Sequence, residues 1–203
     1  MILIDIGNTT ACVYENSHIK RIDIKSFNPN NYKDKVYFIS VNSSFTTLPK
    51  NYINLEPYFE IDTAYVGLGI DRIASCYYIE NGIIVDAGSA ITVDTMKNGK
   101  HLGGFILPGF GAYINAYKSI SCRLNYDLNT SIDLDKLPNS TQEAISYGII
   151  TSIVNSIKTY AKDETIYLTG GDSSFLNQFF KNAVSEKNLV FEGMKKLIDN
   201  LQL

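Results

Sequence analysis

The chain has 203 residues, of which 45% are hydrophobic and 19% are charged. This composition is typical of a globular protein with one large or two small domains, and it excludes disordered and fibrous classes. Eighteen Lys and Arg residues stand against 21 Asp and Glu residues, which gives a net charge of −3. Nucleic acids and anionic membranes bind basic surfaces, so we expect neither as a partner.

Cysteine and histidine are scarce. Cys12, Cys76 and Cys122 are odd in number and form no CxxC pair, which indicates reduced thiols in a cytoplasmic protein. With only two histidines, a zinc site lacks its usual ligands, so any bound metal is expected to be a hard cation held by oxygen atoms. The N-terminus lacks the pattern of a signal peptide, and no stretch is apolar enough for a membrane helix.

Short apolar runs alternate with longer stretches of helical periodicity. The runs predict strands at residues 1–4, 36–41, 83–85 and 166–168, and the Asn-Gly pair within residues 97–100 predicts a hairpin turn. Isoleucines at spacings of three and four residues predict a long helix capped at Thr141 and Gln142. A second helix is predicted from Ser173 past Phe180. The pattern is that of a mixed α/β fold.

One pattern occurs twice: an apolar run ends in Asp-x-Gly, and small hydroxyl residues follow. The two copies are Asp5–Thr9 and Asp86–Ala90. The glycine lets the backbone approach a ligand, and the amides and hydroxyls after it can hold phosphate oxygens. A strand-ending turn without a ligand is the alternative for each copy. The repeat suggests two related halves that face each other across a cleft.

Three further motifs allow a structural or a functional role. Gly69–Arg72 is either a helix cap with a solvated arginine, or a carboxylate that accepts a proton from a substrate hydroxyl beside a guanidinium that binds a carboxylate. Gly103–Gly109 indicates that the backbone closely approaches another strand or a ligand. Thr169–Asp172 precedes a helix N-terminus, where anions are favoured. The P-loop motif is absent.

In this order along the chain, six motifs together resemble the type III pantothenate kinases: Asp5–Thr9, Gly69–Arg72, Asp86–Ala90, Gly103–Gly109, Thr141–Ala144 and Thr169–Gly171. That family belongs to the superfamily of acetate and sugar kinases, Hsp70 and actin. The resemblance implies two ribonuclease-H-like α/β halves, residues 1–80 and 81–203, with mixed sheets flanked by helices and ATP in the cleft between them. It also implies transfer of the ATP γ-phosphoryl group to the 4′-hydroxyl of pantothenate, the first step of coenzyme A synthesis.

The resemblance also implies roles for individual residues. ATP would contact Ser89, Gly170, Gly171 and a first phosphate loop made of Asp5, Ile6, Gly7, Asn8, Thr9, Thr10, Ala11 and Cys12. Asp5 would lie near Mg²⁺, and Asp86 would bind a monovalent cation, K⁺ or NH₄⁺. Asp71 would be the general base. Pantothenate would contact Tyr65, Gly69, Ile70, Asp71, Arg72 and Thr141, the last from across a homodimer interface.

Two other functions remain as alternatives. One is a non-catalytic binding or regulatory protein of the same fold, like the Bvg accessory factor relatives. The other is a different small-molecule kinase of the superfamily, acting on a sugar or on a carboxylate such as acetate. The joint presence of Asp5, Asp71, Arg72 and Asp86 favours the pantothenate kinase, because a scaffold needs no such set of side chains.

Overall fold

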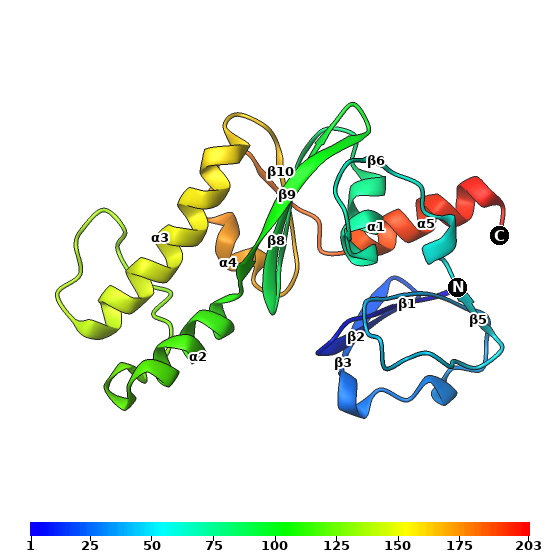
Figure 1. Cartoon of the computed structure of the whole chain (residues 1–203), viewed down its shortest axis with the longest axis horizontal. Coiled ribbons are helices and arrows are strands. Elements are labelled where there is room, and N and C mark those ends of the chain that lie inside the picture. Colours follow the sequence, from blue (N-terminus) through cyan, green and yellow to red (C-terminus); the bar gives the residue numbers. More distant parts are fainter. The chain divides into compact units, whose positions relative to one another are not determined.

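A computed structural model describes residues 1–203, which form two compact units (Figure 1). The first unit contains residues 1–80, 96–103 and 188–203, and the second contains residues 81–95 and 104–187. The boundary after residue 80 is the same as that of the predicted halves. In contrast to the predicted halves, residues 96–103 and 188–203 are grouped with the first unit.

The first unit is built on a five-stranded sheet. Its strands are β1 (Ile2–Ile6), β2 (Thr10–Glu15), β3 (His18–Asp23), β4 (Val36–Ser40) and β5 (Tyr52–Asn54). They lie in the order β3-β2-β1-β4-β5. The central strand β1 is antiparallel to β2 and parallel to β4, so the sheet is mixed.

Helices α1 (Ile70–Tyr78) and α5 (Leu189–Leu201) pack together on one face of this sheet. Leu3 of β1 joins the buried cluster that they form, whereas Ile2, Ile4 and Ile6 lie in a second cluster on the other face. Alternate residues of a strand point to opposite faces, which accounts for this division. The second face is covered by connecting segments that include the short helices η1 (Ile24–Ser26) and η2 (Pro29–Asn31).

The second unit holds another mixed sheet. Its strands are β7 (Gly82–Ala87), β8 (Ala90–Lys97), β9 (Lys100–Pro108), β10 (Ile166–Thr169) and β11 (Ala183–Ser185), with neighbours in the order β11-β10-β7-β8-β9. The β8–β9 tip belongs to the first unit, where β6 (Asp62–Thr63) pairs in parallel with Lys100 and His101. The helices of the second unit are α2 (Phe110–Ile120), α3 (Thr141–Ala161) and α4 (Ser173–Asn177), together with η4 (Cys122–Leu124).

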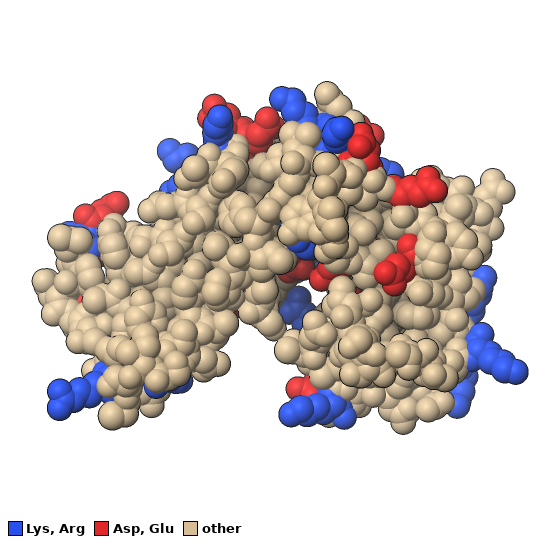
Figure 2. Space-filling view, viewed as in Figure 1, with Lys and Arg blue, Asp and Glu red and all other residues tan.

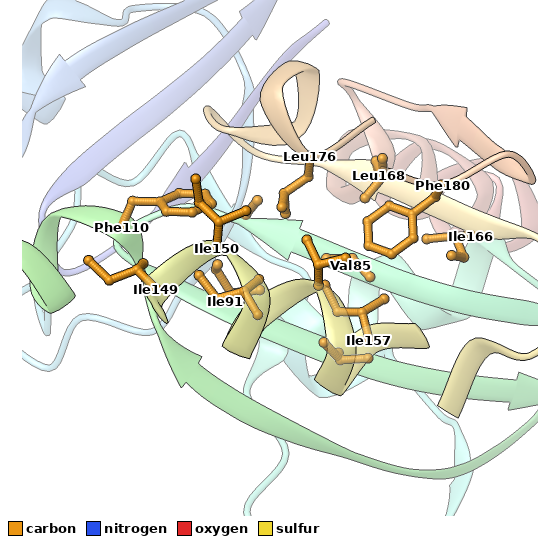
Figure 3. Close-up of a cluster of buried hydrophobic side chains, with 14 of the residues drawn as sticks. Val85, Ile91, Phe110, Ile149, Ile150, Ile157, Ile166, Leu168, Leu176 and Phe180 are labelled. Carbon is orange, nitrogen blue, oxygen red and sulfur yellow. The ribbon is translucent and has the colours of Figure 1, made fainter. Parts of the chain in front are cut away.

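The isoleucine stripe of α3 faces the core of the second unit. Ile149, Ile150 and Ile157 lie with side chains of β7, β8 and β10 in one buried cluster, as Figure 3 shows. A helix buries one stripe when apolar residues recur every three or four positions, so the periodicity of the sequence predicted this packing correctly. The predicted strands and the Asn-Gly hairpin are also confirmed; Asn98 and Gly99 have φ values of 52° and 74°. The predicted class, two mixed sheets flanked by helices, is therefore confirmed.

Two predicted helix ends need correction. The cap of α3 is Ser140, one residue before the predicted Thr141, because the Ser140 hydroxyl accepts the Glu143 N–H at 3.3 Å. Helix α4 ends at Asn177 and does not continue past Phe180. The backbone N–H groups of Phe179 and Phe180 donate to carbonyls three residues earlier, so the chain tightens there before β11.

No helix of the structure is long and apolar enough to cross a bilayer. On the face seen in Figure 2, acidic and basic side chains are interspersed, and neither sign covers a continuous area.

Candidate active site

The first Asp-x-Gly segment forms the end of β1 and the turn into β2. The Gly7 N–H donates to the Thr10 carbonyl at 3.0 Å, which closes the turn and leaves Asn8 and Thr9 exposed at its tip. Asp5 is half-buried and lies opposite Cys12 in the β1–β2 ladder. Ile6 and Ala11 are fully buried core side chains, so only their backbone could meet a ligand.

The second Asp-x-Gly segment has the same position in the second unit. Asp86 is half-buried near the end of β7, and Ser89 is exposed in the turn that leads to β8. The Gly88 N–H donates to the Ala90 carbonyl at 3.0 Å, as the Gly7 N–H does to Thr10 in the first copy. Each copy is therefore a tight turn after a buried strand, with a half-buried carboxylate before it.

Two other glycine motifs meet this second turn. The Gly109 N–H donates to the Ser89 carbonyl at 3.1 Å, and the Asp172 N–H donates to the Ala87 carbonyl at 2.9 Å. Gly170 has a φ of +87°, and a Cβ there would lie 2.6 Å from the Ala87 carbonyl carbon. Only glycine tolerates both conditions. Segments that are far apart in the sequence thus form one cluster of backbone around Asp86–Ala90.

Helix α1 positions the Gly69–Arg72 motif. Gly69 is the N-cap, and Asp71 lies in the first turn, where its Oδ1 accepts the Arg72 N–H at 2.8 Å. Asp71 is half-buried, and Arg72 is only 7% exposed. The predicted structural alternative of a solvated arginine is therefore wrong for Arg72. A carboxylate in the first turn is also favoured by the helix dipole.

Tyr65 lies beside Arg72. The guanidinium carbon of Arg72 is 4.9 Å from the centre of the Tyr65 ring, and an Arg72 N–H group donates to the Tyr65 hydroxyl at 3.4 Å. The ring of His101 is 5.9 Å from that of Tyr65, and its Nδ1 is 2.7 Å from the Thr63 hydroxyl. Four side chains from three segments of the first unit therefore support one another.

Thr141 is the first residue of α3 and is exposed, while Ile70 beside Asp71 is buried. The structure thus brings Tyr65, Gly69, Asp71 and Arg72 together within the first unit, and Ser89, Asp86 and Gly170 together within the second.

Sequence reasoning did not find two polar residues near these motifs. His101 is 1% exposed and supports Tyr65; it lies on β9 just before the Gly103–Gly109 motif, whose glycine pattern does not involve a histidine. Asn42 donates through Nδ2 to the Gly7 carbonyl at 3.2 Å, across 35 positions of sequence. Neither residue has a local sequence signal, since each contact depends on strands that meet only in the folded sheet.

The donor types fit the predicted ligands. Asp5 and Asp86 are half-buried carboxylates beside exposed turns, and oxygen ligands of this kind suit Mg²⁺ and other hard cations. Residues 8, 9 and 89 are exposed, and backbone amides and hydroxyls are groups that can bind phosphate oxygens. Two pockets are lined by none of the predicted site residues: one of about 720 Å³ beside β4 and β5, which Asn42 helps to line, and one of about 500 Å³ at the end of α3.

Comparison with known proteins gives a consistent family. The family model for type III pantothenate kinase matches residues 40–163. A type III pantothenate kinase from Campylobacter hominis is 52% identical over 201 residues, which cover 98% of each chain. The corresponding protein of Campylobacter jejuni is 47% identical and covers 98% of this chain and 96% of its own.

Solved structures add a comparison of folds. A Campylobacter jejuni crystal structure, described as a conserved putative Baf family transcriptional activator, has a TM-score of 0.92 at 46% identity, with full coverage of both chains. A putative 2-dehydro-3-deoxygalactonokinase from Sinorhizobium meliloti has a TM-score of 0.59 at 6% identity, with 98% of each chain covered. At that identity the likeness is one of fold alone.

Proposed function

This chain belongs to the type III pantothenate kinase family and is an ATP-dependent kinase of pantothenate, and we propose that Asp71 is its general base. The observation that carries the activity is 52% identity to a type III pantothenate kinase over 98% of the chain. The assignment of Asp71 rests on a half-buried carboxylate placed beside a buried arginine at the start of α1.

The proposed reaction is the phosphoryl transfer of this family, with Asp71 as the base. The 4′-hydroxyl oxygen of pantothenate attacks the γ-phosphorus of ATP, the bond from that phosphorus to the β,γ-bridging oxygen breaks, and ADP leaves. The hydroxyl proton passes to the Asp71 carboxylate. In phosphoryl transfer the protein mainly positions the reactants and neutralises charge, and one well-placed base contributes about 10²- to 10⁴-fold.

Arg72 and Tyr65 are proposed to hold the acceptor. The Arg72 guanidinium can bind the pantothenate carboxylate with two parallel hydrogen bonds, and the Tyr65 ring and hydroxyl hold the guanidinium in place. Gly69 and Ile70 supply the backbone beside Asp71. Thr141 is proposed to reach the acceptor bound to a second copy of the chain, which makes the active form a homodimer.

The two Asp-x-Gly turns are proposed to bind the nucleotide. Residues 5–12 and Ser89 would contact the phosphates, and Gly170 and Gly171 would contact the rest of ATP. Asp5 would hold Mg²⁺, which supplies charge neutralisation at the phosphates when bound. Asp86 would hold K⁺ or NH₄⁺. A role in coenzyme A synthesis, together with the cysteine content, supports a cytoplasmic location.

The test is ADP release by the purified protein with Mg-ATP, with and without pantothenate, in potassium, ammonium or sodium buffer. We expect release that depends on pantothenate and is faster with potassium or ammonium. Equal rates with all three ions would overturn the cation role of Asp86 and leave the kinase intact. Acetate and sugars serve as control acceptors and should give no release.

One solved relative, from Campylobacter jejuni, is described as a putative transcriptional activator, which corresponds to the alternative of a non-catalytic binding protein. A folded protein that binds ATP but releases no ADP with any acceptor would favour that alternative over the kinase.

A further inference from the structure

Asn42 lies just beyond β4 and reaches the first Asp-x-Gly turn. Its Nδ2 group donates to the Gly7 carbonyl at 3.2 Å. Its Oδ1 atom accepts the Ser44 N–H at 2.9 Å. Because one side of the amide must donate and the other must accept, these two contacts fix its orientation. A flip of the Asn42 amide would break both hydrogen bonds, so the side chain holds the Gly7 carbonyl in one orientation.

Ser40 strengthens the same connection. Its hydroxyl lies 3.4 Å from the Ile6 carbonyl and 3.2 Å from the Asn42 carbonyl, and it accepts the Asn42 N–H at 3.1 Å. The Val41 N–H also donates to the Ile6 carbonyl, at 3.1 Å. Two consecutive carbonyls at the end of β1 are thus held by the segment 40–42.

The geometry of a trans peptide links this contact to the ligand side of the turn. In a trans peptide the carbonyl and the following N–H point in opposite directions. Holding the Gly7 carbonyl toward Asn42 therefore turns the Asn8 N–H away from β4, at the exposed tip of the turn. The Gly7 N–H is already used by the Thr10 carbonyl, so the Asn8 N–H is the first amide of the turn that can face a phosphate.

We infer that Asn42 is a positioning residue for nucleotide phosphate, acting through the Gly7–Asn8 peptide. The inference rests on the proposed function in one respect, namely that this turn binds the phosphates of ATP. It assigns no contact between Asn42 and the substrates. Its effect is to keep one amide donor directed at the phosphate before ATP arrives, which lowers the cost of ordering the turn on binding.

The main test compares Asn42→Ala with a matched control, Asn51→Ala. Asn51 also donates through Nδ2 to backbone carbonyls of the same unit, those of Tyr32 and Asp34, at 3.1 and 2.6 Å. Both variants lose hydrogen bonds to backbone, but only Asn42 touches the turn. Asn42→Ala should raise the KM for ATP about fivefold to tenfold and leave the KM for pantothenate within about twofold. Asn51→Ala should lower the melting temperature and leave both KM values unchanged.

A second pair of variants separates the effect of losing the Gly7 contact from the effect of an added negative charge. Asn42→Asp keeps the size and the Ser44 contact but opposes the Gly7 carbonyl with a carboxylate oxygen, so its KM for ATP should rise at least as much as that of Asn42→Ala. Ser43→Asp adds the same charge on an exposed neighbour while leaving Asn42 intact, and its KM for ATP should stay within about twofold of wild type.

The inference is overturned if Asn42→Ala leaves the KM for ATP within twofold of wild type, or if Asn51→Ala raises it equally. Calorimetric titration with Mg-ATP distinguishes this failure from that of the proposed function. A wild-type protein that binds Mg-ATP without phosphorylating pantothenate would overturn the proposed function alone, and the dissociation constants of the variants would then test Asn42. Loss of binding in wild type would overturn both.

Discussion

Asp71 illustrates how one residue type acquires a role from its surroundings. The chain has 21 acidic residues, and most of them cannot act as a base toward a bound alcohol because they lie in open solvent. Asp71 is half-buried at the start of a helix, next to an arginine whose side chain is buried. This placement puts a carboxylate and a guanidinium on the same turn of α1, as the proposed roles of general base and carboxylate-binding group require.

Asp71→Asn should therefore separate chemistry from binding. The amide cannot accept the hydroxyl proton, so we expect kcat to fall about 10²- to 10⁴-fold while the dissociation constant for Mg-ATP is unchanged. The measurement is steady-state kinetics together with nucleotide titration. Asp62→Asn, in the same unit but 68% exposed and in a surface ion pair with Lys100, is the control and should keep full activity. Equal kcat for both variants would remove Asp71 from the mechanism.

Tyr52 gives a prediction about alkaline stability. Burial, with a smaller contribution from Tyr32, raises the pKa of Tyr52 to about 12, and its hydroxyl donates to the Pro29 carbonyl at 3.0 Å. In the unfolded chain a tyrosine ionises near pH 10. Tyr52 thus stabilises the fold fully below about pH 10, and its contribution is lost as the pH rises toward 12.

Tyr52→Phe removes both the hydrogen bond and the titration. At pH 8 the variant should be less stable than wild type by about 1 kcal/mol, and this difference should shrink between pH 10 and 12. Urea unfolding across that range measures it. Tyr58→Phe, at an exposed position, should show a constant difference from wild type. If the stability difference between wild type and Tyr52→Phe grew between pH 10 and 12, the raised pKa of Tyr52 would be contradicted.

At the scale of elements, the C-terminal helix α5 belongs to the first unit and packs closely against α1. Gly193 of α5 faces the Ala74 backbone so closely that an added Cβ would fall on the Ala74 carbonyl. Met194 and Leu197 of α5 are buried in the cluster that includes Ile70 and Ala74. In the middle of this helix, Lys195 donates to the Tyr14 hydroxyl at 2.8 Å.

Gly193→Ala and Gly111→Ala should change stability in opposite directions. The first forces α5 away from α1 and should cost about 1–3 kcal/mol. The second adds a methyl group in α2 where no atom lies within 4 Å, and the better helix propensity of alanine should add about 0.5–1 kcal/mol. The measurement is the urea concentration at the unfolding midpoint, compared between variants whose unfolding curves have the same denaturant dependence (m value). A stabilising Gly193→Ala would mean that α5 does not pack this closely in solution.

The helices also show that the periodicity of apolar residues predicts long helices well and the ends of short helices poorly. The stripe of α3 predicted its buried face because 21 residues contain several turns of regular spacing. The five-residue α4 contains hardly more than one turn, so the phenylalanines after it resembled a continuing helix. Phe179 and Phe180 pack in or against the core of the second unit, but the backbone that carries them is a tightened turn that precedes a strand.

For the whole molecule, nucleotide binding should couple to stability. A ligand that binds only the folded state stabilises it by about 2.7 kcal/mol at a concentration 100 times its dissociation constant. We therefore expect Mg-ATP to raise the unfolding free energy by about this amount, and excess EDTA to remove most of the gain if Mg²⁺ is needed for tight binding. Denaturant unfolding with ATP alone, with Mg-ATP and with Mg²⁺ alone measures the coupling. Equal stabilisation with and without EDTA would exclude a divalent ion from the nucleotide site.

The fold class and the location of the motifs were predictable from the sequence. Short apolar strands, a long helix with an apolar stripe and an Asn-Gly turn are local patterns, and the backbone physics that produces them acts over a few neighbouring residues. The six motifs were also identified from the chain alone, since each requires a glycine or a charged group at a fixed local spacing. The family followed from their order.

Contacts between distant segments were decided only by the tertiary structure. Asn42 and Gly7 meet because β4 lies parallel to β1, and Tyr65 meets His101 because β6 lies beside the tip of β9. The return of residues 188–203 to the first unit was likewise invisible in the sequence. The sequence by itself determined the fold class, several strands, the buried face of α3 and the motifs of the proposed site. Strand pairing and helix packing decided which side chains support those motifs, because such contacts depend on the summed burial of many residues rather than on any local pattern.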